Sequence, residues 1–360
     1  MYPRSKGLAD KRILFAPHEI GGQMQLMVEE LRRRGYFATA ACDHQEFRGY
    51  INDIQLNSGS KKGRVRQHWA ELLFAAWAAS NYDIFHFFWG RSLLGFDIAP
   101  HPDLPALKRM GKKILVHFRG TDVLNPDLLT CTETSAEVTA TTKPDMSRPY
   151  QQRSLRSWRK YADRLLVSWP GLLDVVPEAV LVPPAIDVDY WRPGEQNATG
   201  RSALRVLHAP TARWKKGTEH VLRAIEGLRS SGVPVELELV EGVPARKVKE
   251  RYERCDVAID QLAYGWHGTF SVEMMALGKP VICYIDRRFL RHRPDLPIVS
   301  AGPGSLQRCL MDLIGSPARR RELGEAGRAY ACKYHDVKVV VDKCLGIYRD
   351  VCGVAPGSGR

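Results

Sequence analysis

The chain contains the same short pattern twice, once near its start and once past its middle. Arg12-Ile-Leu-Phe-Ala-Pro17 and Arg205-Val-Leu-His-Ala-Pro210 are both apolar runs that end at an Ala-Pro pair. Each is followed by a short loop and then by a helical pattern, which stops at Gly35 in the first case and near Gly232 in the second. A buried strand, a turn and a helix in this order are typical of parallel α/β proteins. The repetition therefore predicts two α/β units of related design.

Other short apolar runs supply further strands for both units. Helical stretches such as Gln67–Ala79 separate these runs, so we expect parallel sheets that are buried on both faces. We expect Trp69, Phe74 and Trp77 of that helix to pack in the core. The expected strands are Asp83–Phe88, Lys113–Phe118, Arg164–Ser168 and Val180–Val182 in the first half, and Val235–Val240, Val257–Asp260 and Val281–Tyr284 in the second.

A proline-rich segment, Pro183–Gly194, separates the two halves. We expect an N-terminal domain over residues 1–185 and a C-terminal domain over 186–335. A helix over 336–360 is expected to pack back toward the N-terminal domain and to fray from residue 353. Leu124–Pro149 lacks periodicity and is expected to form a long loop. Ser316 is expected to cap a helical region that begins at Pro317.

The composition excludes several classes of protein. With 360 residues and 44% hydrophobic content, the chain is long enough to bury two cores. Its eight cysteines form no CxxC pair, which argues against a zinc site or a disulfide framework and favours a reducing, cytoplasmic environment. No apolar run approaches the roughly 20 residues that span a bilayer. The N-terminal sequence lacks an apolar signal-peptide region, so we expect no secretion.

The net charge of +13 favours anionic partners, because a field of this sign steers anions toward the protein. Nucleotide sugars, nucleic acids and anionic membrane surfaces are the candidates. Arg153, Arg156 and Lys160 would form one basic stripe on a helix. The chain lacks the interleaved aromatic and basic residues of a nucleic-acid-binding module, so nucleic acid is the weaker candidate. Peripheral contact with a membrane stays open.

The second half carries the clearest candidate site. Arg213 and Lys216 lie in a basic loop directly after a strand. Further along, Gly268 begins a helix that has Glu273 in its first turn and ends at Gly278. A helix N-terminus offers unpaired N–H groups and partial positive charge, and Arg and Lys balance the charge of a phosphate. Together these residues predict a site for a nucleotide diphosphate.

In their order and spacing, these segments resemble the GT-B glycosyltransferases, specifically the retaining family 4 group. The resemblance covers nearly the whole chain and is most specific over residues 208–282. It implies an α/β fold of two Rossmann-like domains that face each other across a cleft. It also implies an enzyme that transfers a sugar from a nucleoside-diphosphate sugar to a hydroxyl or amine. The motifs that carry it are Gly21-Gly22, Tyr82-Asp-Ile-Phe-His86, Ile186-Asp187, Lys216-Gly217, Val272–Val281, Leu323–Tyr330 and Tyr334-His335.

The resemblance assigns roles to single residues on the donor side. It implies that Arg213 and Lys216 neutralise the donor diphosphate, and that Glu273 accepts hydrogen bonds from the ribose hydroxyls. The backbone around Gly268 and Thr269 would meet phosphate oxygens, as would the Gly21-Gly22 loop of the other domain. Each role has a physical reason, since glycines allow close backbone approach and helix N-termini attract anions.

Two further residues are placed near the reacting carbon of the donor sugar. His117 and Arg119 lie at the end of the expected strand Lys113–Phe118, where open α/β sheets bind ligands. The resemblance implies that one of them reaches the donor sugar. The loop that contains Val243 is expected near the nucleotide base, with uridine favoured over guanosine.

The chain departs from the family pattern at one position. Family 4 enzymes usually carry two glutamates separated by seven residues, and the first engages hydroxyls of the donor sugar. Here the residue eight positions before Glu273 is Gly265. We therefore expect sugar recognition to use other groups, with His267, Trp266 and main-chain N–H groups as candidates.

The resemblance also implies a mechanism. Transfer would retain the anomeric configuration, and because no convincing carboxylate nucleophile is present, the leaving β-phosphate held by Arg213 and Lys216 would deprotonate the acceptor. No metal or other cofactor is expected. The acceptor stays open between a small molecule, a glycan and a lipid-linked compound. A nucleotide-sugar epimerase and a non-catalytic sugar-nucleotide-binding protein remain alternative functions.

Overall fold

A computed structural model describes residues 7–43, 51–56, 64–95, 100–124, 147–194, 203–244 and 247–355. The chain divides into two compact domains. Of the described residues, the first domain comprises those up to Leu124, those from Ser147 to Ala185 and those from Val337 onward. The second domain comprises the described residues from Ile186 to Asp336. Each domain is described by itself below.

The first domain is built on a parallel sheet of seven strands in the order β3-β2-β1-β4-β5-β6-β7. Its central strands are apolar and buried along nearly their whole length, as a sheet covered on both faces requires. The strands are β1 (Arg12–Ala16), β2 (Phe37–Cys42), β3 (Ile54–Gln55), β4 (Ile84–Phe88), β5 (Lys113–Phe118), β6 (Arg164–Val167) and β7 (Val180–Leu181).

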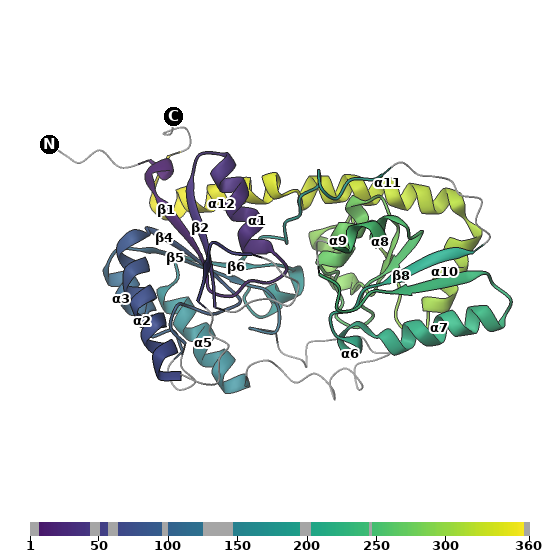
Figure 1. Ribbon diagram of the computed structural model, residues 1–360, viewed down its shortest axis with the longest axis horizontal. Helices are drawn as coiled ribbons and strands as arrows, with labels where there is room; N and C mark the ends of the chain where they lie inside the picture. The colour runs from purple at the N-terminus through teal and green to yellow at the C-terminus, as the bar shows by residue number, and fades with distance from the viewer. Residues whose placement is uncertain are drawn as a thin grey trace. The chain divides into compact units, whose positions relative to one another are not determined.

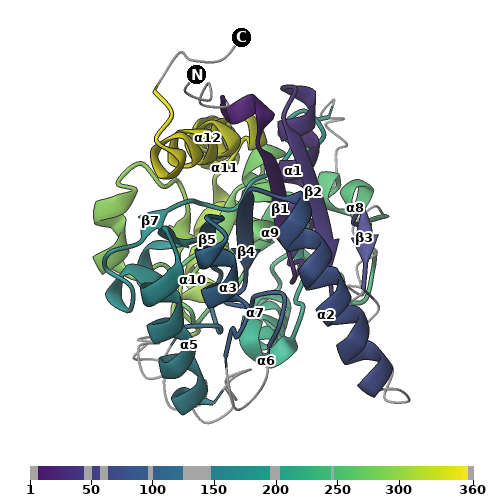
Figure 2. The ribbon, with the colours of Figure 1, turned by 90° about the vertical axis from the view of Figure 1, so that its left-hand side faces the viewer.

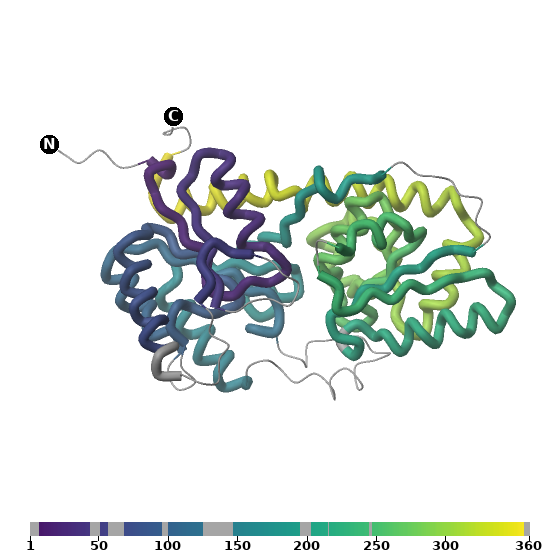
Figure 3. The backbone as a smooth tube through the Cα atoms, in the orientation of Figure 1, coloured from purple at the N-terminus to yellow at the C-terminus, as the bar shows by residue number. Residues whose placement is uncertain are grey.

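Helices cover both faces of this sheet (Figures 1 and 2). On one face, α1 (Gln23–Arg33) and α12 (Val337–Cys352) pack together over a shared apolar core. The chain thus returns its C-terminal helix to the first domain, as the tube in Figure 3 shows. His86 of β4 and Tyr348 of α12 anchor it, with 2.6 Å between Nδ1 and the hydroxyl. The other helices are α2 (Arg64–Asn81), α3 (Leu104–Arg109) and α5 (Arg148–Tyr161).

The second domain has a parallel sheet of five strands in the order β12-β11-β10-β8-β9. These are β8 (Leu204–His208), β9 (Val235–Leu239), β10 (Val257–Ile259), β11 (Val281–Cys283) and β12 (Val299–Ser300). An apolar core joins the sheet to α7 (Thr218–Ser230) and α10 (Leu306–Gly315). The remaining helices are α6 (Arg213–Lys216), α8 (Lys249–Glu253), α9 (Thr269–Ala276) and α11 (Pro317–Tyr334).

Helices α9 and α11 approach each other closely because α11 presents glycines at the contact. A Cβ on Gly324 would lie 2.1 Å from the carbonyl oxygen of Gly278, so only glycine fits there. Gly278 follows α9 with a φ of +71°, the left-handed conformation that commonly ends a helix. This contact fixes the C-terminal end of α9.

The expected α/β architecture of two parallel sheets is confirmed. Every expected strand is present, with ends within one residue of prediction, and Ser316 caps α11 by accepting the Arg319 N–H. The expected basic stripe is also present, since α5 exposes Arg153, Arg156 and Lys160. Strands β2, β3 and β12 and helices α3 and α10 were not predicted.

Three local expectations are wrong. Arg213 and Lys216 belong to the short helix α6 rather than to a loop. Glu273 lies in the second turn of α9, because the helix begins at Thr269. Trp69 and Trp77 of α2 are not core residues, since 62% and 44% of their surfaces are exposed. Within the expected loop Leu124–Pro149, residues 125–146 lie outside the described residues, and α5 begins at Arg148.

Candidate functional site

In the second domain, two neighbouring strands, β8 and β10, end at the point where the strand order reverses. From β8 the chain crosses to β9 on one side, whereas from β10 it crosses to β11 on the other. The carboxyl ends of such a strand pair leave a crevice between the following loops, and ligands of open α/β sheets bind there. Helix α6 follows β8, and Asp260 follows β10.

Lys216 and Asp260 meet at this crevice. The Lys216 ammonium lies 2.5 Å from Oδ1 of Asp260. The other carboxylate oxygen, Oδ2, accepts the backbone N–H of Gly268 at 2.9 Å and the Ser271 hydroxyl at 2.6 Å. The carboxylate is 1% exposed and the Lys216 side chain 18%. Burial alone would raise the pKa of Asp260, but the charge of Lys216 and these hydrogen bonds hold its pKa below the usual 3.8.

This arrangement joins the two parts of the predicted diphosphate site. Asp260 holds Lys216 in place and leaves two of its three ammonium N–H donors for another acceptor. It also ties Lys216 to Gly268, the residue that precedes α9. The next N–H groups of α9, beginning at Thr269, have no acceptor within the helix. An ammonium group and a helix N-terminus therefore converge on one point at the switch in strand order.

Sequence reasoning gave Asp260 no role, although it recognised the strand that Asp260 follows. A carboxylate directly after a buried strand is a signal in itself, because an unpaired acid is costly to bury. The partner of this carboxylate cannot be named until the order of β8 and β10 in the sheet is known.

Arg213 lies one helical turn before Lys216, and its charge is balanced by Glu241 in the loop after β9. Its guanidinium makes a two-pronged contact with Glu241, at 2.9 Å from Nε to Oε1 and 2.7 Å from Nη2 to Oε2. This hydrogen bonding raises the pKa of Arg213 and lowers that of Glu241. A diphosphate would have to replace Glu241 to engage this guanidinium. Arg213 is therefore less available than Lys216.

The other donor-side candidates lie around this crevice in the second domain. Thr269 and Glu273 are half-buried, at the start and in the second turn of α9. Val243 is half-buried in the loop after β9 and follows Gly242, whose φ is +65°. The roles of these three residues in donor binding stay predictions.

The loop between Asp260 and α9 is held by the buried side chain of Gln261. Its Oε1 accepts the Ala263 N–H at 2.8 Å, and its Nε2 donates to the carbonyls of Trp266 and Tyr284. This network fixes the path of the chain from the sheet to the start of α9. The two consecutive residues Asp260 and Gln261 thus organise the helix N-terminus and the loop before it.

His267 is the predicted donor residue with the most unusual surroundings. The side chain is 93% buried against the rings of Trp266, Tyr330 and His335, and neither ring nitrogen has a hydrogen-bond partner among the described residues. Burial lowers its pKa to about 4, so the ring is neutral at pH 7. A neutral imidazole has one donor and one acceptor to offer, next to the start of α9.

In the first domain, the Gly21-Gly22 pair leads into α1. Both glycines are left-handed, with φ values of +65° and +73°, and Gly22 is the residue that caps the helix. The first free N–H groups of α1 are already engaged, because the buried carboxylate of Glu19 accepts those of Met24 and Gln25 at 3.2 Å each. The turn thus has the predicted conformation, but Glu19 holds two of the helix amides that a phosphate would use.

Arg119 and His117, at the end of β5, have different surroundings. Arg119 is half-buried over the Phe88 ring; burial lowers its pKa to about 10, and the carboxylates of Glu19 and Asp122 oppose this. His117 is fully buried, and its Nε2 donates to the carbonyl of Val182 at 3.0 Å. Burial and the charge of Arg119 lower the His117 pKa well below 6.5, so the ring is neutral. Its Nδ1 has no partner among the described residues.

The sequence matches no protein-family profile and no curated protein. Solved structures match over almost the whole chain. A sucrose-phosphate synthase from Thermosynechococcus elongatus superposes with a TM-score of 0.68 at 15% identity, covering 96% of this chain and 100% of its own. Two parallel α/β domains with this connectivity decide the architecture. This chain has the GT-B fold.

Other GT-B structures match at lower similarity. The Anabaena protein HepE, crystallised with UDP-glucose, has a TM-score of 0.62 at 11% identity, covering 94% of this chain and 100% of its own. A proposed UDP-N-acetylglucosamine 2-epimerase from Listeria monocytogenes has a TM-score of 0.58 at 11% identity, covering 96% and 98%. At these identities the likeness concerns the fold.

The structure gives a physical reason for glycine at position 265, where the family 4 pattern has glutamate. The backbone there is left-handed, with a φ of +76°, which side chains rarely adopt. A Cβ would also lie 3.1 Å from the Cβ of Asp286. A side chain at that position would therefore strain the backbone and press on Asp286.

Two negative findings concern only the described residues. No three His, Cys, Asp or Glu side chains come together in them to ligate a metal. None of the helices within them is long and apolar enough to cross a membrane.

Proposed function

We propose that this protein is a glycosyltransferase that takes its sugar from a nucleoside-diphosphate sugar, with UDP favoured over GDP. The observation that carries the proposal is the convergence of Lys216, fixed by Asp260, with the N-terminus of α9 at the strand switch of the second domain. A cation and a set of helix amides at such a point suit a diphosphate. The GT-B likeness to a synthase and to a UDP-glucose-bound protein supports the same assignment.

The proposed reaction breaks the bond between the anomeric carbon and the β-phosphate oxygen and forms a bond from that carbon to the acceptor oxygen or nitrogen. With retention, the acceptor attacks from the face that the diphosphate leaves, and its proton passes to the departing phosphate. The ammonium of Lys216 and the amides of α9 stabilise the negative charge that develops on the phosphate. In this proposal no metal takes part, and Arg213 joins only after releasing Glu241.

The first test is a thermal-shift screen of UDP-, GDP- and dTDP-sugars on the full chain. A ligand that binds only the folded state raises its stability by RT ln(1 + [L]/Kd), so the correct nucleotide raises the melting temperature. We expect UDP-sugars to give the largest shift. Absence of any shift with all three nucleotides would contradict a nucleotide-sugar site.

Lys216→Ala tests the catalytic assignment. Removing a preorganised donor to a developing charge typically costs about 10²–10³ in rate, and we expect a loss of this size in sugar transfer. Lys249→Ala is the matched control, because Lys249 also lies 2.5 Å from a carboxylate, that of Glu253 one turn further along α8. Lys216→Arg, which keeps the positive charge beside buried Asp260, serves if Lys216→Ala does not fold. Full turnover in a folded Lys216→Ala protein would overturn the assignment.

An epimerase is the second candidate, because a proposed UDP-sugar epimerase shares the fold over nearly the whole chain. Incubating the protein with its donor sugar, without any acceptor, separates the two reactions. An epimerase converts the donor sugar under these conditions, whereas a transferase needs the acceptor. Donor binding with neither reaction would identify a sugar-nucleotide-binding protein.

A further inference from the structure

Helix α2 of the first domain shows the reverse of the usual surface pattern. The inner side carries the half-buried Phe74 and the buried Ala78 and Ala79. Four large apolar side chains nevertheless point away and are exposed: Trp69 (62%), Leu72 (41%), Leu73 (69%) and Trp77 (44%). A surface helix normally turns polar residues outward, so an exposed apolar face indicates a surface that binds another molecule or a membrane.

The exposed residues form one continuous stripe. Trp69, Leu73 and Trp77 follow each other at intervals of four residues, and Leu72 lies beside them at the three-residue spacing, so all four share one side of the helix. The two indoles frame the leucines. Tryptophan combines a large apolar ring with one polar N–H, which suits the boundary between hydrocarbon and water. We call these four residues the outer stripe of α2.

Positive charge precedes the outer stripe in the sequence and lies near its C-terminal end in the structure. Before it in the sequence come Lys61, Lys62, Arg64 and Arg66, and the only carboxylate of α2, Glu71, lies 3.3 Å from His68. At the other end, the Trp77 ring contacts Tyr82, and the Arg12 guanidinium sits over the Tyr82 ring at 5.5 Å. No ion pair involves Arg12 within the described part of the chain.

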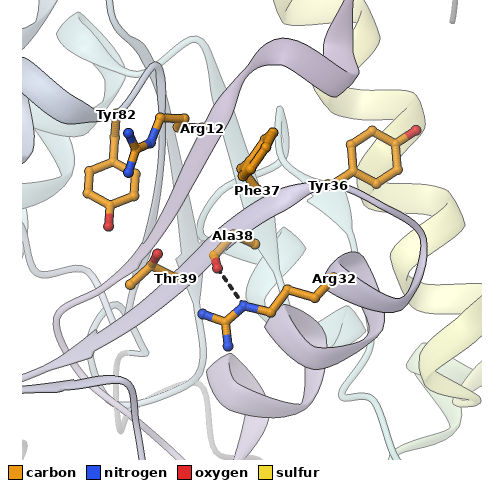
Figure 4. Close-up of a pocket in the computed structure, with 7 residues that line it drawn as sticks. All are labelled: Arg12, Arg32, Tyr36, Phe37, Ala38, Thr39 and Tyr82. Carbon is orange, nitrogen blue, oxygen red and sulfur yellow. Dashed lines mark hydrogen bonds between the residues drawn. The ribbon is translucent and has the colours of Figure 1, made fainter. Parts of the chain in front are cut away.

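Arg12 also lines a cavity of about 260 Å³ at the end of the outer stripe (Figure 4). The cavity lies at the start of the paired strands β1 and β2 and is lined in part by Tyr82 and by Phe37, which is 65% exposed. Figure 4 shows the Arg12 guanidinium beside the Tyr82 ring, with Phe37 opposite. An accessible cation and another exposed aromatic side chain thus continue the outer stripe to the edge of the sheet.

We propose that the outer stripe of α2 binds the surface of an anionic lipid bilayer. The helix lies flat, the indoles and leucines enter the boundary between headgroups and hydrocarbon, and Arg12 meets the lipid phosphates. Exposed apolar residues on one side and an accessible cation beside them are features of an interfacial helix. A second copy is the less suitable occupant, because each copy carries a net charge of +13. The proposal does not depend on the transfer reaction.

Flotation of the full chain with lipid vesicles tests this. We expect the protein to float with phosphatidylcholine vesicles that contain phosphatidylglycerol, to float less as salt is added, and to stay unbound with phosphatidylcholine alone. Trp69→Gln/Leu73→Gln/Trp77→Gln should abolish flotation without lowering the melting temperature. Met311→Gln, which removes a 45% exposed apolar side chain from α10, is the matched control and should float normally. Arg12→Gln should weaken vesicle partitioning about fivefold.

Two results would overturn the proposal. One is equal flotation of the wild type and the triple variant, which would place the lipid contact elsewhere or nowhere. The other is a wild-type dimer in sedimentation velocity that the triple variant converts to a monomer, with no vesicle binding by either protein. That outcome would assign the outer stripe to a second copy. The donor-binding screen measures ligand binding by the second domain, so either test can fail while the other succeeds.

Discussion

At the scale of single residues, the charge balance between Lys216 and Asp260 decides what the crevice can hold. The carboxylate is almost fully buried, and it satisfies one N–H of Lys216, the N–H of Gly268 and the hydroxyl of Ser271. A phosphate that arrives at Lys216 is attracted by the ammonium and repelled by this carboxylate. Asp260 therefore orients the cation at the cost of weaker anion binding.

Asp260→Asn separates these two effects. The amide keeps an acceptor for Gly268 or Ser271 but removes the negative charge. We expect UDP to bind more tightly, because the repelling charge is gone. We expect kcat for sugar transfer to fall, because Lys216 is no longer held; loss of one preorganised donor costs about 10²–10³ in rate. Isothermal titration with UDP and steady-state kinetics measure both.

Asp256→Asn is the control for the Asp260 variant. Asp256 lies directly before β10 and accepts the Arg205 N–H at 2.8 Å, so it has a comparable structural role without contact to Lys216. We expect unchanged UDP affinity and kcat in this control. Weaker UDP binding with an unchanged kcat in Asp260→Asn would contradict the orienting role.

Much of this half-site was predictable from the sequence, and the rest was hidden for a definite reason. Lys216 and Gly268 stand out because each marks the edge of a regular element. The link between them through Asp260 depends on β8 and β10 being neighbours, and that order follows from tertiary pairing over many residues. The same holds for Gly265, whose left-handed backbone and contact with Asp286 are set by the loop path.

At the scale of elements, one side chain joins three segments of the second domain. Nη1 of Arg328 in α11 lies 2.9, 2.9 and 3.0 Å from the carbonyl oxygens of Val188, Trp191 and Ala276, which share its two N–H donors. Ala276 is the last residue of α9, so the cation also sits at the negative end of that helix. The contact holds the far end of the helix whose N-terminus forms the candidate site.

Arg328→Gln should therefore destabilise the protein. Hydrogen bonds from a charged group contribute about 1.5–3 kcal/mol, and the buried carbonyls lose their donor, so we expect a loss of about 3 kcal/mol in the free energy of unfolding. Urea denaturation followed by circular dichroism measures it. Arg321→Gln, on the exposed side of the same helix, should change stability by less than about 0.5 kcal/mol. Equal midpoints for both variants would refute the role of Arg328.

Helix α2 shows what element-level patterns miss. Its apolar residues predict a helix, and the helix is present, but both of its sides are apolar. The pattern then gives no preference for which side meets the sheet. The side with Ala78 and Ala79 packs inward, because their small side chains allow the helix to approach the rest of the domain closely. The indoles of Trp69 and Trp77 are left exposed. Strand β2 was missed for a related reason, since Phe37-Ala-Thr-Ala-Ala-Cys42 is made mostly of small residues.

At the scale of the whole molecule, the repeated strand-to-helix pattern was enough to predict two parallel sheets. Buried parallel strands are continuous apolar runs, and this signal survives in a single sequence. The return of α12 to the first domain is less visible locally, because it rests on distant contacts such as that between His86 and Tyr348. These contacts bury histidines as neutral rings, and this makes the stability of the fold depend on pH.

Several histidines lose proton affinity when the chain folds. Burial lowers the pKa of His86 and His101 to about 3 and of His267 to about 4, and it lowers that of His117 well below 6.5. Between these values and 6.5, only the unfolded chain binds the protons, so falling pH favours unfolding. Two buried acids act in the opposite sense: burial raises the pKa of Asp103 and Asp122 to about 6, so their protonation on acidification favours the folded state.

The histidines should prevail, and the protein should lose stability as the pH falls from 7 to 5. Over this interval, each buried neutral histidine lowers the free energy of unfolding by about 2 kcal/mol, and each of the two acids raises it by about 1 kcal/mol. Urea midpoints at pH 7, 6 and 5 measure the net effect. His101→Gln should flatten this dependence by about one histidine's share, whereas His68→Gln, at a side chain that is 49% exposed, should leave it unchanged. A midpoint that stays constant or rises toward pH 5 would show that these rings take up protons in the folded protein.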